Sequence, residues 1–194
     1  MLSTGLLQFG AFNLGETVQP FRINLDLLPS YPEVLHHITT LSDDLLKNVH
    51  YDHFLSTTDA IPFGVALSLH TSKPLVYSRG GKLSPAYDLV GAYDVGHPAI
   101  LLTNIVVDGK VLKPLIDSAN RVGLAVHSVI SIFSLSKYVA LDHVSVTALL
   151  PIHQVLAYLG ETNYLTERFI ATVHQKLSQF ENGANYHHPV KEQP

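Results

Sequence analysis

Four short apolar runs constrain the fold of this chain more than any other feature of its sequence. Each is bounded by glycine, proline, asparagine or serine, and they cover residues 54–55, 74–77, 99–107 and 126–133. Nearly continuous apolar runs of this length are typical of strands buried on both faces of a sheet. Helix-like stretches lie between them at residues 63–69 and 111–122, and Gly123 is suited to end the second. This alternation predicts an α/β fold whose central, mostly parallel sheet is flanked by helices.

Further elements are expected on both sides of these runs. Ser30 and Pro32 are suited to start a helix that reaches about Asn48. One face of this helix is apolar and should meet the sheet through Val34, Leu35, Ile38, Leu41, Leu45 and Leu46. A glycine-rich stretch at residues 78–97 predicts a long loop or a loose hairpin. The rest of the chain should form a strand at 144–147, helices at 151–159 and 163–180, and a flexible tail at 181–194.

Composition narrows the class of protein. The 194 residues, 46% of them hydrophobic, suffice for a single domain with its own core. No apolar run reaches the roughly 20 residues that cross a bilayer, and the first nine residues lack the regions of a secretory signal. We therefore expect a cytoplasmic protein that has no membrane partner. The absence of cysteine excludes a disulfide framework, a thiolate metal site and a cysteine nucleophile.

Charge and histidine content argue against two further kinds of partner. The formal net charge is −4 and the cations are scattered, so nucleic acid is not an expected partner. Twelve histidines include two adjacent pairs, one beginning at His36 and one at His187. Adjacent side chains on a helix diverge by roughly 100°, so these pairs do not converge on one point and no metal site is expected.

The turn after the longest apolar run is the first candidate for a ligand site. It reads Val107-Asp108-Gly109-Lys110 and leads into the expected helix at Val111. In α/β sheets ligands bind beyond the carboxyl ends of the strands. A glycine turn at a helix start presents unpaired amides and the positive end of the helix dipole, which together hold a phosphate. A tight turn without a ligand explains the same residues, and both interpretations stay open here.

Several segments between Phe9 and about Leu177 match, in order and spacing, the motifs of one enzyme family. The first match consists of FGAFNL, which begins at Phe9, followed by QPF from Gln19 and by Asn24. The others are the pair Tyr51-Asp52, the segment KPLVYSR from Lys73, and Gly91 with Gly96. Together they resemble the FGxFxLxSGxxSPxY hood segment, the FD pair, the KPMxxxRK strand and the glycine spacing of orotate phosphoribosyltransferases. The resemblance implies a type I phosphoribosyltransferase fold with a small N-terminal hood at residues 1–30 over a core at 31–180. It also implies a homodimer and, in an active enzyme, Mg²⁺ bound with phosphoribosyl pyrophosphate.

The positions that match the family's phosphoribosyl pyrophosphate motif depart from its pattern. Its two acidic residues, which hold the ribose hydroxyls, become Thr103 and Asn104. Its hydroxyl-rich phosphate loop is replaced by Val107, Asp108, Gly109, Lys110 and Val111. Neutral side chains cannot match a carboxylate in charge-assisted bonding to a hydroxyl or in stabilising an oxocarbenium ion. The motif is degenerate.

Three further parts of the implied site have also changed. The pyrophosphate loop has no glycine and gains an acid, because its equivalents are Thr57, Thr58 and Asp59. The basic loop keeps only Arg79 and Lys82, of which Lys82 is the candidate catalytic residue. The family's arginine for the orotate carboxylate falls on Leu135, which cannot pair with an anion.

These departures leave three readings of the function. The first is an inactive or greatly impaired transferase, retained for phosphate or nucleotide binding or for a regulatory partner. The second is an active phosphoribosyltransferase with a divergent site, which would use Arg79, Lys82 and the dipole of the helix at Val111. The third is an interaction module whose old site is filled by side chains such as Ile61, Val107 and Leu135.

Overall fold

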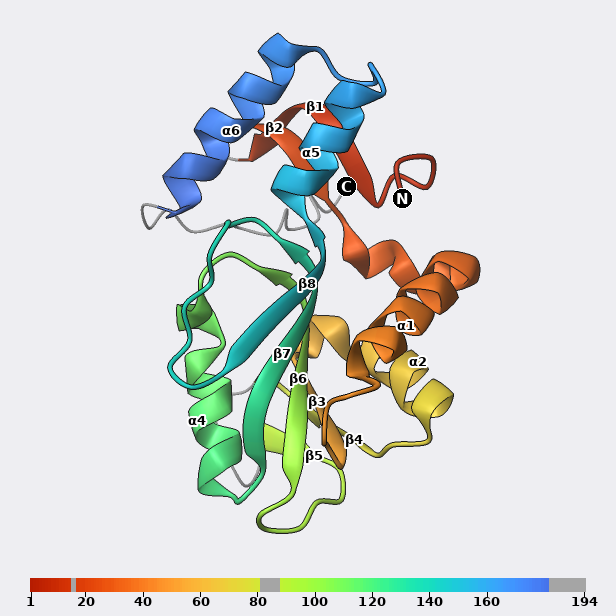
Figure 1. The fold of residues 1–194 in the computed structure, drawn as a ribbon, viewed down its shortest axis with the longest axis vertical. Coiled ribbons are helices and arrows are strands. Elements are labelled where there is room, and N and C mark those ends of the chain that lie inside the picture. The colour runs from red at the N-terminus through yellow and green to blue at the C-terminus, as the bar shows by residue number, and fades with distance from the viewer. Residues whose placement is uncertain (15–16, 81–87, 182–194) are drawn as a thin grey trace.

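The centre of the molecule is a six-stranded sheet (Figure 1). The computed structural model describes residues 1–14, 17–80 and 88–181. The strand order is β5-β4-β3-β6-β7-β8, and every neighbouring pair is parallel except β4 with β5. The strands are β3 (His53–Ser56), β4 (Leu75–Ser78), β5 (Leu89–Val90), β6 (Pro98–Val106), β7 (Ala125–Ser134) and β8 (Ser145–Pro151). The four apolar runs are β3, β4, β6 and β7, so the predicted mostly parallel α/β sheet is confirmed.

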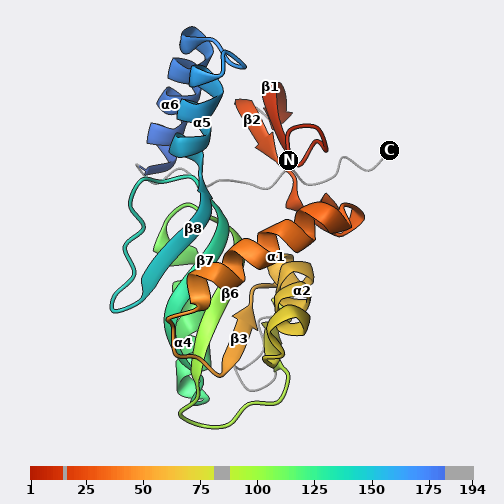
Figure 2. The same cartoon turned by 45° about the vertical axis from the view of Figure 1, so that its right-hand side comes forward.

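Helices cover both faces of this sheet. The helices α1 (Pro32–Leu46) and α2 (Ile61–Thr71) lie on one face (Figure 2). The 3-10 turn η3 (Gly109–Val111) leads into α4 (Lys113–Arg121) on the other face. Gly123 follows α4 with φ of 92°, as its predicted role requires. Within the described residues, no helix combines the length and the apolar character that crossing a membrane requires.

The start and the inward face of α1 differ from the prediction. Ser30 ends the 3-10 helix η1 (Leu25–Ser30), and Tyr31 takes the N-cap position without a side-chain hydrogen bond. Two polar residues are buried on α1, and the apolar Leu41 and Leu45 are 41% and 45% exposed. The buried hydroxyls of Thr39 and Ser42 donate to carbonyls four residues earlier, at 2.8 Å each. Those bonds satisfy the hydroxyls inside the helix and so permit their burial. The buried face of α1 therefore includes polar positions that the apolar pattern does not.

The first and last described segments of the chain lie together beyond the carboxyl edge of the sheet (Figure 1). Here β1 (Leu7–Leu14) and β2 (Thr17–Ile23) form an antiparallel hairpin beside α5 (Ile152–Glu161) and α6 (Glu167–Glu181). The rings of Phe9 and Phe169 meet edge to face at 6.3 Å. The left-handed Asn163, with φ of 56°, precedes α6, which therefore starts later than predicted. We call β1, β2, α5 and α6 the hood end; the predicted boundaries at residues 30 and 180 remain predictions.

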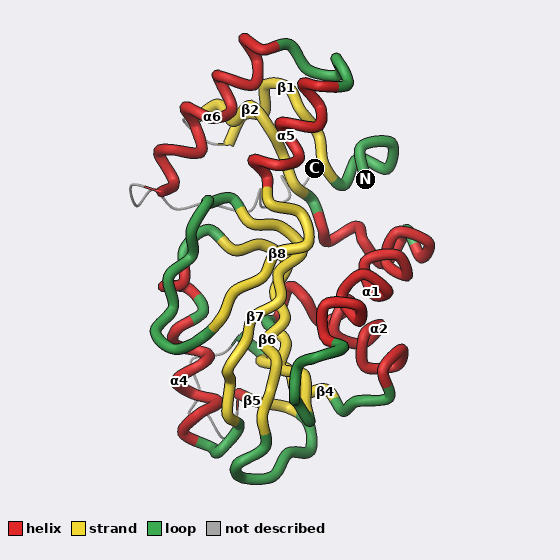
Figure 3. The backbone as a smooth tube through the Cα atoms, viewed as in Figure 1, coloured by secondary structure: helices red, strands yellow, loops and turns green. Residues whose placement is uncertain are grey.

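The glycine-rich stretch contains a short hairpin. Figure 3 labels its two strands, β4 and β5. They pair antiparallel, with Tyr77 opposite Val90 and Ser78 opposite Leu89. The hairpin alternative is therefore confirmed. Lys82 and residues 182–194 of the predicted tail lie outside the described residues.

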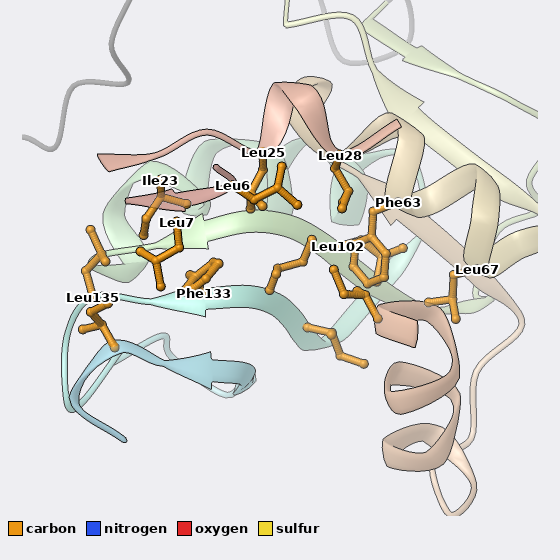
Figure 4. Packing of buried hydrophobic residues seen from close by; sticks show 14 of the residues in the cluster. Leu6, Leu7, Ile23, Leu25, Leu28, Phe63, Leu67, Leu102, Phe133 and Leu135 are labelled. Carbon is orange, nitrogen blue, oxygen red and sulfur yellow. The ribbon is translucent and has the colours of Figure 1, made fainter. Parts of the chain in front are cut away.

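One continuous apolar cluster joins the sheet to the hood end. Figure 4 shows Leu7 and Ile23 of the hairpin beside Phe133 and Leu135 at the end of β7. None of these four side chains is more than 3% exposed. Burial of one large apolar side chain contributes about 1.5–3 kcal/mol. This cluster is therefore a main reason why the hairpin stays on the sheet.

Candidate functional site

The carboxyl ends of β3, β6 and β7 meet at one edge of the sheet, where the fold places a ligand. The structure brings the sequence-predicted residues to this edge on separate elements. Thr57 to Asp59 follow β3, and Val107 to Val111 follow β6. Thr103 and Asn104 lie within β6 and are 3% and 2% exposed. We call these residues, with Arg79, the catalytic edge.

Asn104 ties two parts of the catalytic edge together. Its Nδ2 donates to the carbonyl oxygen of Asp59 at 2.7 Å, across 45 positions of sequence. Its Oδ1 is buried and has no hydrogen-bond partner among the described residues. The amide thus holds the turn after β3 against β6 and leaves one buried acceptor oxygen.

The hydroxyl groups of the turn after β3 also bond to the backbone. Thr57 Oγ1 donates to the carbonyl oxygen of Leu102 at 3.3 Å, and Thr58 Oγ1 donates to that of Ser78 at 3.1 Å. These bonds hold β3 against its neighbours β6 and β4. The hydroxyls are therefore engaged in the fold.

Arg79 lies at the beginning of the loop beside this turn. Its backbone N–H donates to the carbonyl oxygen of Asp88 at 2.9 Å, and its side chain is exposed. The next residue, Gly80, has φ of 69°, and a Cβ there would lie 2.8 Å from Thr58 Oγ1. This close approach places the start of the basic loop against the pyrophosphate-loop equivalent.

The turn after β6 is capped by its own acid. Asp108 Oδ1 accepts a hydrogen bond from the backbone N–H of Lys110 at 3.1 Å, and Lys110 Nζ lies 3.8 Å from Asp108 Oδ2. Gly109 is buried, and a Cβ there would lie against Leu141 and 2.5 Å from the carbonyl oxygen of Ala140. The β7–β8 loop therefore covers this turn. An anion would have to displace the Asp108 carboxylate, so phosphate binding at residues 107–111 stays a prediction.

Leu135, the predicted counterpart of the family's orotate-binding arginine, lies in apolar packing. Leu135 is fully buried and lies beside Leu7, Ile23 and Phe133 (Figure 4). No charged side chain could be accommodated there without breaking that cluster. This part of the implied site belongs to the core.

Sequence reasoning missed two cavities near the hood end. The larger, of about 710 Å³, is mainly apolar and lies between the first residues, β8 and α5; Leu7, Leu150, Val155 and Tyr158 are among the residues that line it. The smaller, of about 310 Å³, is more polar and has Ser134, Ser136, Lys137, His153 and Gln154 in its lining. Each cavity is formed by segments far apart in sequence, so no local motif could reveal it.

The histidines do not form a metal site within the described part of the chain. No group of three or more histidine, aspartate or glutamate side chains there could hold a metal ion. The rings of His36 and His70 are 6.3 Å apart, and those of His153 and His174 stack at 5.2 Å. These are pairs between neighbouring helices, each of two residues only.

Comparison with known proteins agrees with the fold and the motifs. No protein-family model matches the chain. It is 24% identical over 126 residues to an orotate phosphoribosyltransferase of Sulfolobus acidocaldarius, covering 63% of this chain and 64% of that protein. It is 25% identical over 137 residues to an orotate phosphoribosyltransferase of Archaeoglobus fulgidus, covering 68% of this chain and 76% of the relative. The first match thus spans just under two thirds of the relative's length.

Solved structures give the same result. The orotate phosphoribosyltransferase of Francisella tularensis superposes with a TM-score of 0.70 at 17% identity, covering 91% of each chain. The UMP synthase of Leishmania donovani gives 0.75 at 22% identity, covering 91% of this chain and 40% of that one. The chain has the type I phosphoribosyltransferase fold. Its resemblance to the orotate phosphoribosyltransferase family, predicted from the motifs, is confirmed by these sequence relatives and structures.

Proposed function

We propose that this protein is an orotate phosphoribosyltransferase-like protein that is inactive or greatly impaired as a transferase and is retained for binding. The observation that carries the proposal is the hydrogen bonding of the catalytic edge. Asn104, Thr57 and Thr58 all donate to backbone carbonyls, and Asp108 accepts from a backbone amide. A phosphoribosyl ligand would need these polar groups as partners, but they form hydrogen bonds to the protein backbone instead.

The chemistry of transfer explains why this matters. The reaction develops positive charge on the ribose, which a carboxylate beneath the ring stabilises. Thr103 and Asn104 are neutral and nearly fully buried, so they supply no such charge. The same residues do not suit the Mg²⁺ that the family implies, because Mg²⁺ is usually held through carboxylates and water. We therefore derive no step through a metal at this position.

The decisive experiment is an orotate-consumption assay at 295 nm with saturating phosphoribosyl pyrophosphate and magnesium. If two defects each raise the barrier by about 3 kcal/mol, the rate falls on the order of ten-thousandfold, since 1.36 kcal/mol is a factor of ten. Because the defects share one site, their effects need not add. Turnover near the usual enzyme range of about 1 per second would overturn the proposal.

An active transferase with a divergent site is the second candidate. The buried Oδ1 of Asn104, which has no partner among the described residues, favours it because a ribose hydroxyl would satisfy that oxygen. The exposed Arg79 beside Thr58, with Lys82 further along, would supply the cations. Pyrophosphate release measured with phosphoribosyl pyrophosphate and a panel of nitrogen bases other than orotate distinguishes this candidate from the first.

The retained role is binding of a small phosphate-bearing ligand or nucleotide, or of a regulatory partner. Thermal unfolding with and without phosphoribosyl pyrophosphate and nucleotides tests the ligand. A ligand at 100 times its dissociation constant stabilises the fold by about 2.7 kcal/mol. No stabilisation by any of them would favour the pure interaction module. The cytoplasmic location expected from the sequence is part of this proposal, and cell fractionation tests it.

A homodimer is the expected assembly. Besides the family resemblance, the exposed leucines of α1 and α2 support it. Leu41 and Leu45 are exposed on α1, and on the neighbouring α2 Val65 is 43% and Leu69 is 78% exposed. Light scattering at micromolar concentration should give the mass of a dimer. The Leu69→Asp variant should shift that mass toward the monomer if α2 lies in the interface.

A further inference from the structure

We propose that the larger cavity at the hood end binds an uncharged, mainly apolar small molecule, at a site separate from the catalytic edge. The cavity has a volume of about 710 Å³, and ligand pockets span roughly 300–1,000 Å³. Its lining comes from the first residues of the chain, the ends of β7 and β8, α5, and the turn after α5. We call it the hood cavity. Its use would add a function to the one proposed above, and neither depends on the other.

The hood cavity has a closed floor and an open mouth. Leu7, Phe133 and Leu159 form the floor, since these lining side chains are at most 3% exposed. Tyr158 and Tyr164 stand at the mouth, because they also line the cavity but are 64% and 62% exposed. A change from buried to exposed lining is expected of a pocket that a small molecule enters from one side.

The backbone fixes the mouth of the cavity. At the end of α5 the N–H of Asn163 donates to the carbonyl oxygen of Gly160 at 3.0 Å, and that of Tyr164 donates to Leu159 at 2.9 Å. Asn163 itself is left-handed, with φ of 56°, as in a common way of ending a helix. The chain therefore turns back on α5, and the hydrogen bonds that end the helix place Tyr164 near the cavity floor. A mouth that is formed before a ligand arrives lowers the cost of binding.

The lining determines the chemical class of the ligand. No side chain among the described lining residues is charged. The polar groups are the hydroxyls of Ser3, Tyr158 and Tyr164 and the amide of Gln154. An ion would lose its hydration in this cavity without gaining a side chain of opposite charge. An apolar molecule would gain by leaving water, and the few polar groups could bind one or two hydroxyl, carbonyl or amine groups on it.

Other cavities of the molecule differ in this respect. The cavity of about 310 Å³ has Lys137 and His153 in its lining. A third cavity, of about 380 Å³ beside α4, is lined by Lys113, Asp117 and Asp142 among others. Both therefore contain ionisable side chains. The hood cavity is the largest of these three and the one suited to an uncharged ligand.

The experiment uses two fluorescent probes that differ in charge. N-phenylnaphthylamine is uncharged, and its fluorescence rises when it leaves water. Anilinonaphthalene sulfonate has the same aromatic rings with an added sulfonate, so it is the matched charged probe. We expect the uncharged probe to bind more tightly by about tenfold or more, because the sulfonate would have to lose its hydration. Phosphoribosyl pyrophosphate should not displace the uncharged probe, since the catalytic edge is a different site.

Three variants locate the probe. Val155→Trp fills the cavity from α5 and should weaken binding of the uncharged probe by about tenfold or more, because its ring takes the place of the ligand. Tyr158→Ala removes one ring at the mouth and should weaken binding between about twofold and tenfold, as the loss of one aromatic contact does. Tyr138→Ala is the matched control, because Tyr138 is 91% exposed and does not line the hood cavity. Circular dichroism checks that each variant is folded, and the exposed Tyr158 keeps the test valid if Val155→Trp does not fold.

Several results would overturn the inference. The first is no saturable binding of the uncharged probe, or an affinity that neither Tyr158→Ala nor a folded Val155→Trp lowers. Displacement by phosphoribosyl pyrophosphate would place the probe at the catalytic edge, and a loss of affinity in Leu69→Ser would place it on the exposed leucines of α1 and α2. An affinity that falls as the protein concentration rises would mean that a second copy covers the cavity. The orotate assay judges the proposed function separately, so each of these failures leaves that proposal intact.

Discussion

The catalytic edge and the smaller cavity, of about 310 Å³, lie near the same end of the sheet and contain similar small polar residues, but these residues form different kinds of hydrogen bond. At the catalytic edge Thr57, Thr58 and Asn104 donate to carbonyls of other segments, so they join strands. In the smaller cavity Ser134 Oγ donates to the carbonyl oxygen of Ser136, two residues further along the same segment. The presence of polar residues at the end of a strand is therefore not enough to identify a ligand-binding site. A polar group can bind a ligand only if its hydrogen bonds are not already made to other parts of the protein.

The largest expected effect comes from replacing Leu135 with the arginine that the family pattern has. Leu135→Arg would place an unpaired charge in the apolar cluster, and we expect a loss of about 3–5 kcal/mol in the free energy of unfolding. Urea unfolding at pH 7 measures it. The control Leu135→Met keeps the volume and should cost less than about 1.5 kcal/mol. An arginine variant as stable as the wild type would mean that the old orotate position is open.

A carboxylate at the ribose position tests the catalytic edge directly. Asn104→Asp replaces a donor by an acceptor against the carbonyl oxygen of Asp59, and we expect a loss of about 2–3 kcal/mol at pH 7. Burial raises the pKa of such a carboxyl, so the loss should grow as pH rises from 4 to 8.

Asn120→Asp is the matched control for that substitution. Asn120 Oδ1 accepts a hydrogen bond from the backbone N–H of Val126 at 3.1 Å, and a carboxylate can still accept it. The control should therefore be nearly neutral. Equal losses in both variants would contradict the structural role given to the Asn104 amide.

The covered turn after β6 gives a smaller effect. Gly109→Ala would push a methyl group against the Ala140 carbonyl, and we expect a loss of about 1–3 kcal/mol. Thermal unfolding measures it. Gly160→Ala on α5 is the control, because its methyl group meets only the flexible end of Ile170. If both alanine variants are as stable as the wild type, the β7–β8 loop does not close over the turn.

The smallest effect concerns the acid that caps this turn. Asp108→Ala removes the acceptor for the Lys110 amide and should cost about 1 kcal/mol or less. The same change removes the negative charge that opposes an anion there. Calorimetry with inorganic phosphate should therefore show a higher affinity in Asp108→Ala than in the wild type. An unchanged affinity would leave the turn with a purely structural role.

Much of the framework could be predicted because it depends on local patterns. The apolar runs that became β3, β4, β6 and β7 needed no knowledge of their partners, since a continuous apolar run is buried wherever it packs. The prediction was wrong at Ser30 and at Leu41 and Leu45. Ser30 belongs to the 3-10 helix η1, so Tyr31 takes the N-cap position of α1 instead. On the buried face of α1, Thr39 and Ser42 satisfy their hydroxyls inside the helix, and the apolar pattern does not contain those bonds.

The sequence by itself determined the α/β framework, the family resemblance and the neutral pair Thr103 and Asn104, because these depend on residue types and their order. Only the tertiary structure decided what the remaining polar groups do. Asn104 reaches Asp59, and Thr57 reaches Leu102, across 45 positions each. A hydrogen bond needs its two atoms within about 3.5 Å, and that approach is set by the packing of strands rather than by the sequence around either residue.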